Sequence, residues 1–201
     1  MTIIVHSIYR HPVKGLTPEA LETAELTPGK AIPNDRRFAL ALGSTQTETS
    51  ATKWMSKSNF LMLQQNERLA LLQTQFDDQT DILTILRGGR LVARGKLTDR
   101  IGRHTIEDFF DAFMKDEVHG RPKLVEAADA HVLSDHRTPV ISILNLASVN
   151  DVERVTQKPI DPRRFRANVW LEGATPWQEF EWVNKQITIG DLHLTVTERI
   201  D

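Results

Sequence analysis

The sequence predicts a mainly β protein with a few helices, an α+β fold. Short runs of β-branched residues recur between turn signals, and a Gly-Gly pair separates two such runs. Only two segments carry clear helical spacing. The 201 residues suffice for one large domain or two small ones, and 40% apolar residues can form a core.

The first hundred residues predict mostly strands. We expect, in order, strands over residues 2–9, 19–26, 38–42, 68–75, 82–86 and 90–93, with a polar loop over 43–50 and a short buried segment over 60–63. Phe38, Leu40 and Leu42 alternate along their strand, which predicts one buried face. Gly88 and Gly89 suit the positive φ values of a tight hairpin turn.

The clearest helix lies around residue 110. One face of it is formed by five apolar residues at helical spacing: Ile106, Phe109, Phe110, Phe113 and Met114. Thr105 is the expected N-cap, and Gly120 ends the segment. A short strand over residues 121–126 follows. We place a domain seam there, between residues 1–125 and residues 126–201.

The last third opens with a polar loop and ends with a hairpin. We expect a loop over residues 131–138, a strand over 139–144, a helix over 145–155, a strand over 166–171, an aromatic and acidic connection over 177–183, and a hairpin over 187–196 around Gly190 and Asp191. Residues 161–173 combine a Pro-held turn, three arginines and an apolar segment. A strand that begins in a cationic cluster is a candidate anion site.

The composition excludes several classes of protein. A formal charge of −2 argues against nucleic-acid binding. The sequence has no cysteine, which excludes a disulfide framework, a thiolate metal site and a cysteine nucleophile within these residues. The start lacks the pattern of a signal peptide, and no stretch reaches the roughly 18 apolar residues of a membrane span. We therefore expect a cytoplasmic protein.

Cationic residues gather at turns and at the predicted strand ends: Lys14, Arg36, Arg37, Lys53, Arg163, Arg164 and Arg166. Arginine forks match phosphate and carboxylate oxygens bidentately, and lysine supplies a point charge. These residues are candidates for an anion pocket. The alternative is that some of them pair with neighbouring acids: Asp35 with Arg36 or Arg37, and Asp161 with Arg163. On a strand, Arg166 and Asn168 would share one face.

The histidines and serines give no comparable signal. His131 and His136 lie near Asp129 and Asp135, but no compact zinc pattern such as His-Glu-x-x-His is present. We expect no metal ligand among them. The sequence also has no Gly-x-Ser-x-Gly elbow and no common Gly-rich phosphate loop.

Several motifs resemble one known family, in the order that the family shows. Tyr-Arg-His-Pro-Val-Lys-Gly at residues 9–15 and Asn-Asp-Arg-Arg-Phe at residues 34–38 resemble the N-terminal β-barrel domain that precedes MOSC domains. Residues 138–140, 145–149, 164–169 and 189–190 resemble the MOSC domain itself, the C-terminal domain of molybdenum cofactor sulfurases. The resemblance implies a β-barrel-like, two-part fold that binds a molybdopterin-type molybdenum cofactor between its parts.

The resemblance also implies which residues hold the pterin and its phosphate. The cofactor-binding residues so implied are Lys14, Lys53, Arg164, Arg166 and Asn168. Relatives often carry Arg where this chain has Lys53, which weakens the implied grip on phosphate. The resemblance orients Arg166 and Asn168 toward the pocket, and Phe165 and Ala167 toward the core.

The final residues depart from the family pattern. In the family an Arg-Cys pair follows the last hairpin, and its thiolate binds molybdenum or carries sulfur. This sequence stops at Asp201, so we expect a truncated MOSC domain whose cysteine lies beyond that residue. Thiolate ligation needs Cys. The catalytic residue is therefore not assigned within these residues, which we expect to be incompetent for the family's metal chemistry.

Three functions follow from the resemblance. The first is a molybdenum cofactor protein that, when complete, reduces N-hydroxylated small molecules with an electron-transfer partner carrying flavin or heme. The second is a sulfur-carrier or cofactor-delivery module, which would accept persulfide from a pyridoxal-phosphate desulfurase. The third is a non-catalytic β-barrel interaction domain.

Overall fold

The computed structural model describes residues 2–45, 50–51, 53–115, 117–128 and 132–200. These residues divide into two compact units. The first unit comprises Met1–Tyr9, Ala20–Thr23 and Ile141–Asp201, and the second comprises Arg10–Glu19 and Ala24–Val140. The first unit therefore takes residues from both ends of the sequence. Of the predicted segments, residues 46–49 of the polar loop and His131 lie outside the described residues.

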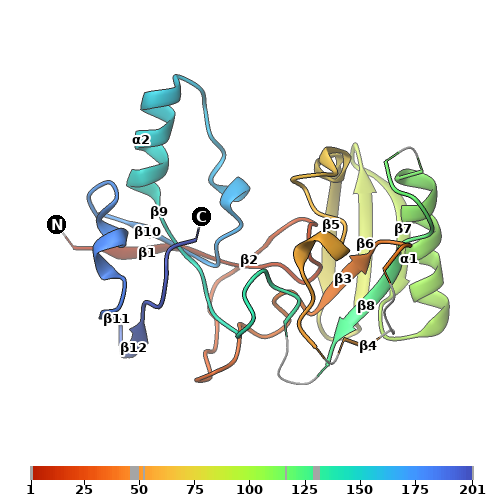
Figure 1. The fold of residues 1–201 in the computed structure, drawn as a ribbon, viewed down its shortest axis with the longest axis horizontal. Helices are drawn as coiled ribbons and strands as arrows, with labels where there is room; N and C mark the ends of the chain where they lie inside the picture. The colour runs from red at the N-terminus through yellow and green to blue at the C-terminus, as the bar shows by residue number, and fades with distance from the viewer. Residues whose placement is uncertain (1, 46–49, 52, 116, 129–131, 201) are drawn as a thin grey trace. The chain divides into compact units, whose positions relative to one another are not determined.

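The described residues form a mixed structure of twelve strands, two α-helices and four short 3-10 helices (Figure 1). This confirms the predicted α+β class. The strands form four sheets that are open at both edges, so closure into a barrel is not seen among these residues. The α-helices have 14 and 11 residues. No described helix is long and apolar enough to cross a membrane.

The hairpin sheet of the second unit confirms the prediction made from its glycines. Strands β5 (Leu72–Asp77), β6 (Ile82–Arg87) and β7 (Arg90–Lys96) pair in sequence order, all antiparallel. Gly88 and Gly89 join β6 to β7 with φ values of 56° and 76°, which other residues adopt only at a cost. The prediction that β5 begins at Arg68 is wrong, because a 3-10 helix, η2 (Glu67–Leu71), precedes it.

The helix α1 (Arg100–Phe113) packs along this sheet (Figure 1). Its predicted apolar face is confirmed, with Ile106, Phe110 and Phe113 buried. The predicted cap at Thr105 is wrong, because the Asp99 side chain accepts a hydrogen bond from Gly102 N at 2.7 Å and starts the helix earlier.

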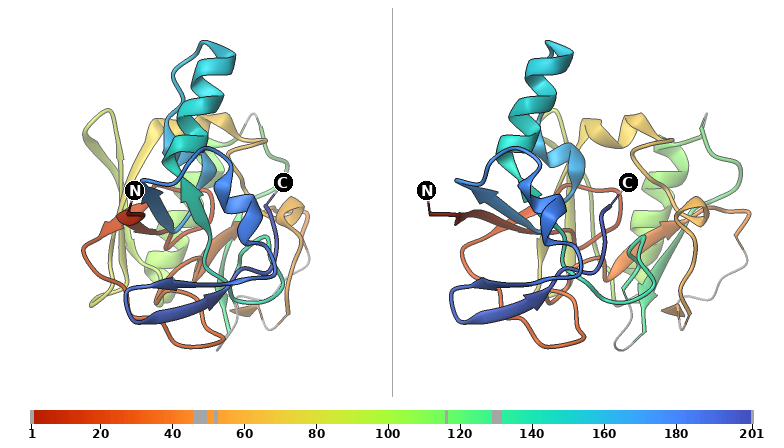
Figure 2. Two further views of the ribbon diagram at one scale, coloured as in Figure 1. Left: turned by 90° about the vertical axis from the view of Figure 1, so that its left-hand side faces the viewer. Right: turned by 60° about the vertical axis from the view of Figure 1, so that its left-hand side comes forward.

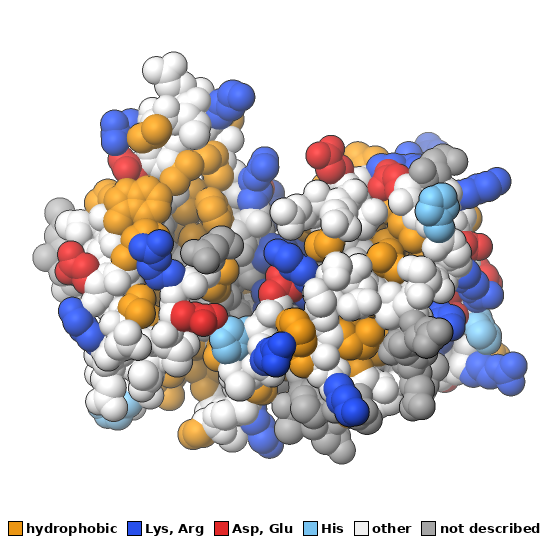
Figure 3. All heavy atoms as spheres, in the orientation of Figure 1, with side chains coloured by type: hydrophobic (Ala, Val, Ile, Leu, Met, Phe, Trp, Pro, Cys, Tyr) orange, Lys and Arg blue, Asp and Glu red, His pale blue; other side chains and the backbone are white. Residues whose placement is uncertain are grey.

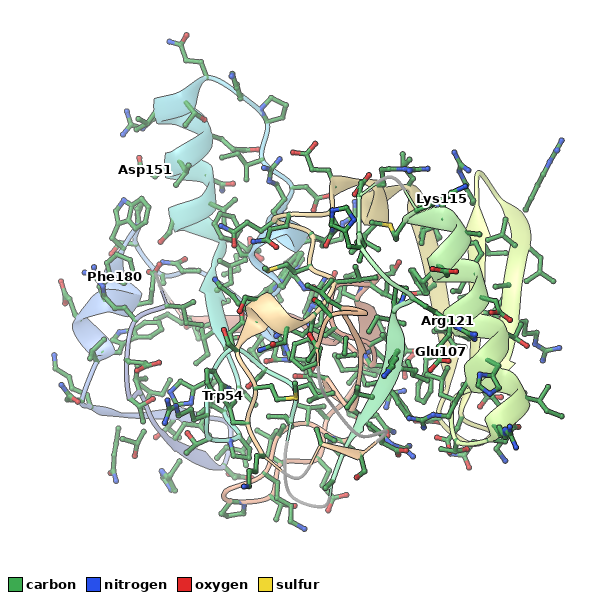
Figure 4. The ribbon with its side chains drawn as sticks, turned by 45° about the vertical axis from the view of Figure 1, so that its right-hand side comes forward. Trp54, Glu107, Lys115, Arg121, Asp151 and Phe180 are labelled. Atoms are coloured by element: carbon green, nitrogen blue, oxygen red, sulfur yellow. The ribbon has the colours of Figure 1, made fainter. Side chains whose placement is uncertain are left out.

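A buried carboxylate ties α1 to the neighbouring sheet. Glu107 accepts a hydrogen bond from Leu124 N at 2.9 Å, and Arg121 lies 3.4 Å from its other oxygen (Figure 4). Leu124 belongs to β8 (Lys123–Ala127), which matches the strand predicted over residues 121–126 within two residues. The pairing satisfies a carboxylate that would be costly to bury alone.

The core of the second unit lies on both faces of the strand β3 (Phe38–Ala41). Strand β3 pairs antiparallel with β8, and β8 also pairs parallel with β4 (Ser50–Ala51). The four residues of β3 are all buried, so the prediction of a single buried face is wrong. Successive side chains point to opposite faces, and they enter two different apolar clusters: Phe38 and Leu40 in one, and Ala39 and Ala41 in the other.

Loops complete the second cluster. Phe60 and Leu61 are buried, as the sequence predicts for residues 60–63, and they follow the 3-10 helix η1 (Lys57–Asn59). Phe60 and Leu133 join the cluster of Ala39 and Ala41. Leu133 thus fixes the polar segment that follows it to the core of this unit.

The first unit is built on a four-stranded sheet in the order β2-β1-β10-β9. The strands are β1 (Ile4–Arg10), β2 (Glu19–Leu21), β9 (Ile143–Asn145) and β10 (Val169–Glu172). β1 pairs antiparallel with β10, and β10 pairs parallel with β9. The predicted strand over residues 139–144 is mostly wrong, since only its last two residues belong to β9.

The helix α2 (Leu146–Thr156) follows β9 in the chain and lies in the connection from β9 to β10 (Figure 2). Asn145 caps it by accepting a hydrogen bond from Ala147 N at 3.0 Å. Gln157 ends it in the left-handed conformation, with a φ of 52°. The helix predicted over residues 145–155 is confirmed.

Two 3-10 helices and a hairpin complete the first unit. These are η3 (Pro162–Phe165), η4 (Gln178–Trp182), β11 (Gln186–Ile189) and β12 (Leu192–Thr195). The predicted hairpin is confirmed, and Gly190 in its turn has a φ of 57°. Figure 3 shows hydrophobic side chains at the surface of this unit, and its exposed apolar residues include Val155, Trp177 and Phe180.

Candidate functional site

The backbone around Lys14 is fixed on both sides. Lys14 N donates to Phe38 O at 2.8 Å, and Phe38 N donates to Pro12 O at 3.0 Å. Gly15 follows with a φ of 81°, and a Cβ at this position would lie 3.0 Å from Leu61 O. Glycine is favoured there, because a side chain would be strained by the positive φ and would crowd Leu61 O. The loop therefore presents the Lys14 side chain in one direction.

The ammonium group of Lys14 is already engaged. It donates to Leu133 O at 2.9 Å and forms a short ion pair with the carboxylate of Asp135. The ring of Phe60 lies 5.8 Å from it, within the range of a cation–π contact. Lys14 is 8% exposed. Sequence reasoning missed Asp135 as its partner, since 121 residues separate the two.

A second ion pair, more buried than the first, lies beside this loop. His11 N donates to Asp35 Oδ1 at 2.6 Å, and the Arg36 guanidinium pairs with the other oxygen of Asp35. Burial raises the pKa of Asp35, but the hydrogen bond from His11 and the charges of Arg36 and His11 outweigh it and lower the pKa to about 2. The sequence alternative that Asp35 pairs with Arg36 is confirmed.

Arg37 is a structural cation. Its guanidinium pairs with Asp81 at 2.7 Å and with Glu126 at 2.8 Å, and it lies over the Phe38 ring at 4.7 Å. Burial lowers the pKa of Arg37, but the hydrogen bonds to these two carboxylates reverse the effect and raise it. Arg37 therefore joins β3 to its neighbours.

Lys53 is exposed and lies between β4 and η1. The next residue, Trp54, is labelled in Figure 4, and the Arg137 guanidinium lies 4.9 Å from the centre of its ring. Lys14 and Lys53 both belong to the second unit. The chain thus offers one buried and one exposed ammonium group there.

The stretch 161–173 begins with a capped turn. Asp161 accepts a hydrogen bond from Arg163 N at 2.9 Å, and Pro162 is the first residue of η3. The Arg163 guanidinium also binds the Asp161 carboxylate, so the predicted ion pair of these two residues is confirmed. That hydrogen bond is the main cause of the lowered pKa of Asp161.

Arg164 and Arg166 lie on this turn and not on a strand. The predicted strand over residues 166–171 begins only at Val169. Arg166 ends η3 in the left-handed conformation, with a φ of 53°, because the capped turn of residues 161–165 extends to it. The prediction that Arg166 and Asn168 share one face of a strand is therefore wrong. Arg164 is exposed and Arg166 is half-buried.

Asn168 joins three segments of the first unit. Its Oδ1 accepts hydrogen bonds from Ser142 N at 3.1 Å and Ser142 Oγ at 3.0 Å, and its Nδ2 donates to Tyr9 O at 3.1 Å. It is 1% exposed. Ala167 is buried as expected, whereas Phe165 is 48% exposed, so its expected place in the core is wrong. The hydrogen bonds of Asn168 therefore fix the backbone between Arg166 and the start of β10 at Val169.

A polar network missed by sequence reasoning fixes η4 to α2. Glu179 accepts hydrogen bonds from Ser148 Oγ at 2.6 Å and from Asn145 Nδ2 at 2.7 Å. Trp177 N donates to Ser148 Oγ at 2.8 Å. The sequence predicts that a helix begins at Asn145, but it does not show that the Asn145 amide donates to Thr175 O and to Glu179, which lie 30 and 34 positions away.

The predicted site residues thus form two groups. Lys14 and Lys53 belong to the second unit. Arg164, Arg166 and Asn168 belong to the first unit, where they lie in one span of five residues, 164–168. The described residues contain no group of three or more His, Asp or Glu side chains placed to hold a metal ion. Lys14, Arg36, Arg37 and Arg163 are each paired with a carboxylate among the described residues.

Comparison with known families identifies the chain. The model described as the MOSC N-terminal beta barrel domain matches residues 2–134, and the model described as the MOSC domain matches residues 116–201. The chain belongs to the family of the MOSC N-terminal beta barrel domain and carries a MOSC domain after it. The resemblance inferred from the motifs is confirmed. No curated protein matches the chain.

Proposed function

We propose that this chain binds a molybdopterin-type molybdenum cofactor. The observation that carries the proposal is the succession of the two matches, from residue 2 to residue 201. The MOSC family is associated with this cofactor. The proposal takes the cationic candidates of each unit separately: Lys14 and Lys53 in the second unit, and Arg164 and Arg166 in the first.

The chemistry of these side chains fits a phosphate group. Arginine offers paired N–H donors that match phosphate oxygens, and lysine offers a compact charge. Lys14 supports the proposal best, because its loop is held by backbone hydrogen bonds and its ammonium already binds an anion, the Asp135 carboxylate. Arg166 would contribute from the end of η3.

Asn168 has a supporting role in this proposal. Its amide is engaged with Ser142 and Tyr9, and its own backbone N donates to Ser142 O at 3.0 Å. These bonds fix the chain two residues after Arg166. We propose that Asn168 orients Arg166 by holding this backbone in place.

The metal end of the cofactor has no thiolate ligand in these residues, because the sequence contains no cysteine. When bound, the cofactor supplies two-electron redox chemistry at molybdenum, and the protein supplies orientation and electrostatics. We assign cofactor binding to residues 1–201. The reduction of N-hydroxylated small molecules, with an electron-transfer partner, belongs to the proposal only for a protein that also provides the cysteine.

Cofactor delivery is the alternative function. A sulfur carrier needs a cysteine on which the persulfide forms, and none is present in the sequence. A delivery module needs only to bind and release the cofactor. It would retain pterin without turning over a substrate, which separates it from a reductase in an activity assay.

The proposal is tested by measuring bound cofactor. The chain is purified from a host that makes the cofactor, and its molybdenum and pterin contents are determined by mass spectrometry and by fluorescence of the oxidised pterin. We expect Lys14→Ala and Arg166→Ala to lower the pterin content. Arg163→Ala is the matched control, since Arg163 lies on the same turn and is paired with Asp161. Full pterin occupancy in both test variants would refute the site.

A further inference from the structure

The contact between Lys14 and Asp135 joins groups with very different exposure. The Lys14 side chain is 9% exposed, whereas the Asp135 side chain is 64% exposed. The cation is therefore held inside the second unit, and the anion reaches it from solvent.

The segment that carries Asp135 has a fixed anchor two residues earlier. Leu133 is 4% exposed, packs in the second apolar cluster, and donates its N–H to Arg36 O at 2.9 Å. The carbonyl oxygen of Leu133 also accepts a hydrogen bond from the Lys14 ammonium group. Departure of the Asp135 carboxylate would thus leave both the segment and the ammonium in place, so that another anion can contact the ammonium.

We infer that Asp135 is an internal competitor for the anion position at Lys14, which a phosphate group must displace in order to bind. This inference rests on the proposed function, because it concerns the same site. Solvent screens the exposed Asp135 carboxylate, which weakens its attraction to Lys14. A phosphate monoester carries more negative charge than a carboxylate at neutral pH and has three acceptor oxygens. Displacement by phosphate is therefore favoured over displacement by a simple carboxylate.

The test is a titration with inorganic phosphate, followed through the backbone amide signals of residues 11–16 and 132–138 by NMR at constant ionic strength. We expect Asp135→Asn to bind phosphate roughly fivefold more tightly than the wild type, since it keeps the shape of the side chain and removes the competing charge. Asp111→Asn removes the same charge from an exposed position of α1. It is expected to bind as the wild type does.

A Lys14→Gln change, alone and with Asp135→Asn, separates the inference from the proposed function. Equal dissociation constants for the wild type and Asp135→Asn, with weaker binding in Lys14→Gln, would refute the competitor and leave the site intact. If the double variant binds phosphate as tightly as Asp135→Asn alone, Lys14 does not bind phosphate and is not part of the proposed cofactor site. If Asp135→Asn does not bind phosphate at all, the inference that Asp135 competes with phosphate is also refuted. Cofactor binding itself is tested separately, by the pterin content of the purified protein.

Discussion

Replacement of Asn168 by alanine should unfold the first unit more readily. The change removes the hydrogen bonds from Ser142 N and Ser142 Oγ and the bond to Tyr9 O. It leaves a backbone N–H and a carbonyl oxygen without the partner that Asn168 provided. Each buried polar group left without a partner costs about 1–3 kcal/mol, so for the two groups we expect the free energy of unfolding to fall by about 2–6 kcal/mol.

Urea denaturation followed by tryptophan fluorescence measures this loss, because Trp170, Trp177 and Trp182 all lie in the first unit. The control is Asn150→Ala, at an exposed position of α2 in the same unit. It should change the free energy of unfolding by less than about 0.5 kcal/mol. A similar small loss for Asn168→Ala would show that its hydrogen bonds do not hold the sheet together.

Two further predictions concern the second unit. Asp35 has its pKa lowered to about 2, so its stabilising contribution is present above its unfolded pKa of about 3.9 and is lost as the pH falls through about 2. Asp35→Asn should lower the free energy of unfolding by about 2 kcal/mol at neutral pH. It should also flatten the dependence of that free energy on pH between about 4 and 2, which acid denaturation followed by circular dichroism measures. An unchanged slope in this pH range would contradict the prediction. Asp99→Ala removes the cap of α1 and should cost about 1 kcal/mol, with faster hydrogen exchange in the first turn of α1; unchanged exchange there would rule out the cap.

Local chemistry made much of the fold predictable. Gly88 and Gly89 mark the β6–β7 turn, since their positive φ values are those that the turn requires. Asn145 marks the start of α2 because its side chain can cap the helix. Asp99 carried the same kind of signal before α1, and the preference for Thr105 placed the helix start too late.

Long-range contacts explain what could not be predicted. Whether Lys14 would be open to a ligand depended on Asp135, 121 residues away, and no local pattern links the two. The orientation of Asn168 depended on Ser142 and Tyr9, which are 26 and 159 positions distant. Arg166 was misplaced for a different reason, because the Asp161 cap and Pro162 favour a turn over the strand that the apolar residues after it suggest.

The composition of the first unit has a consequence for synthesis on the ribosome. β1 is among the first segments to emerge, but its partner β10 belongs to the last third of the chain. At about 5–20 residues per second, roughly 10–30 s pass before the two can pair. The second unit ends at Val140, about 30 residues before β10, so it is complete roughly 1–6 s earlier. It holds both apolar clusters of the described residues. During that interval β1 can pair with β2, but its other edge, which later pairs with β10, stays open to chaperones and to neighbouring nascent chains. Ile4 and Val5 belong to this strand.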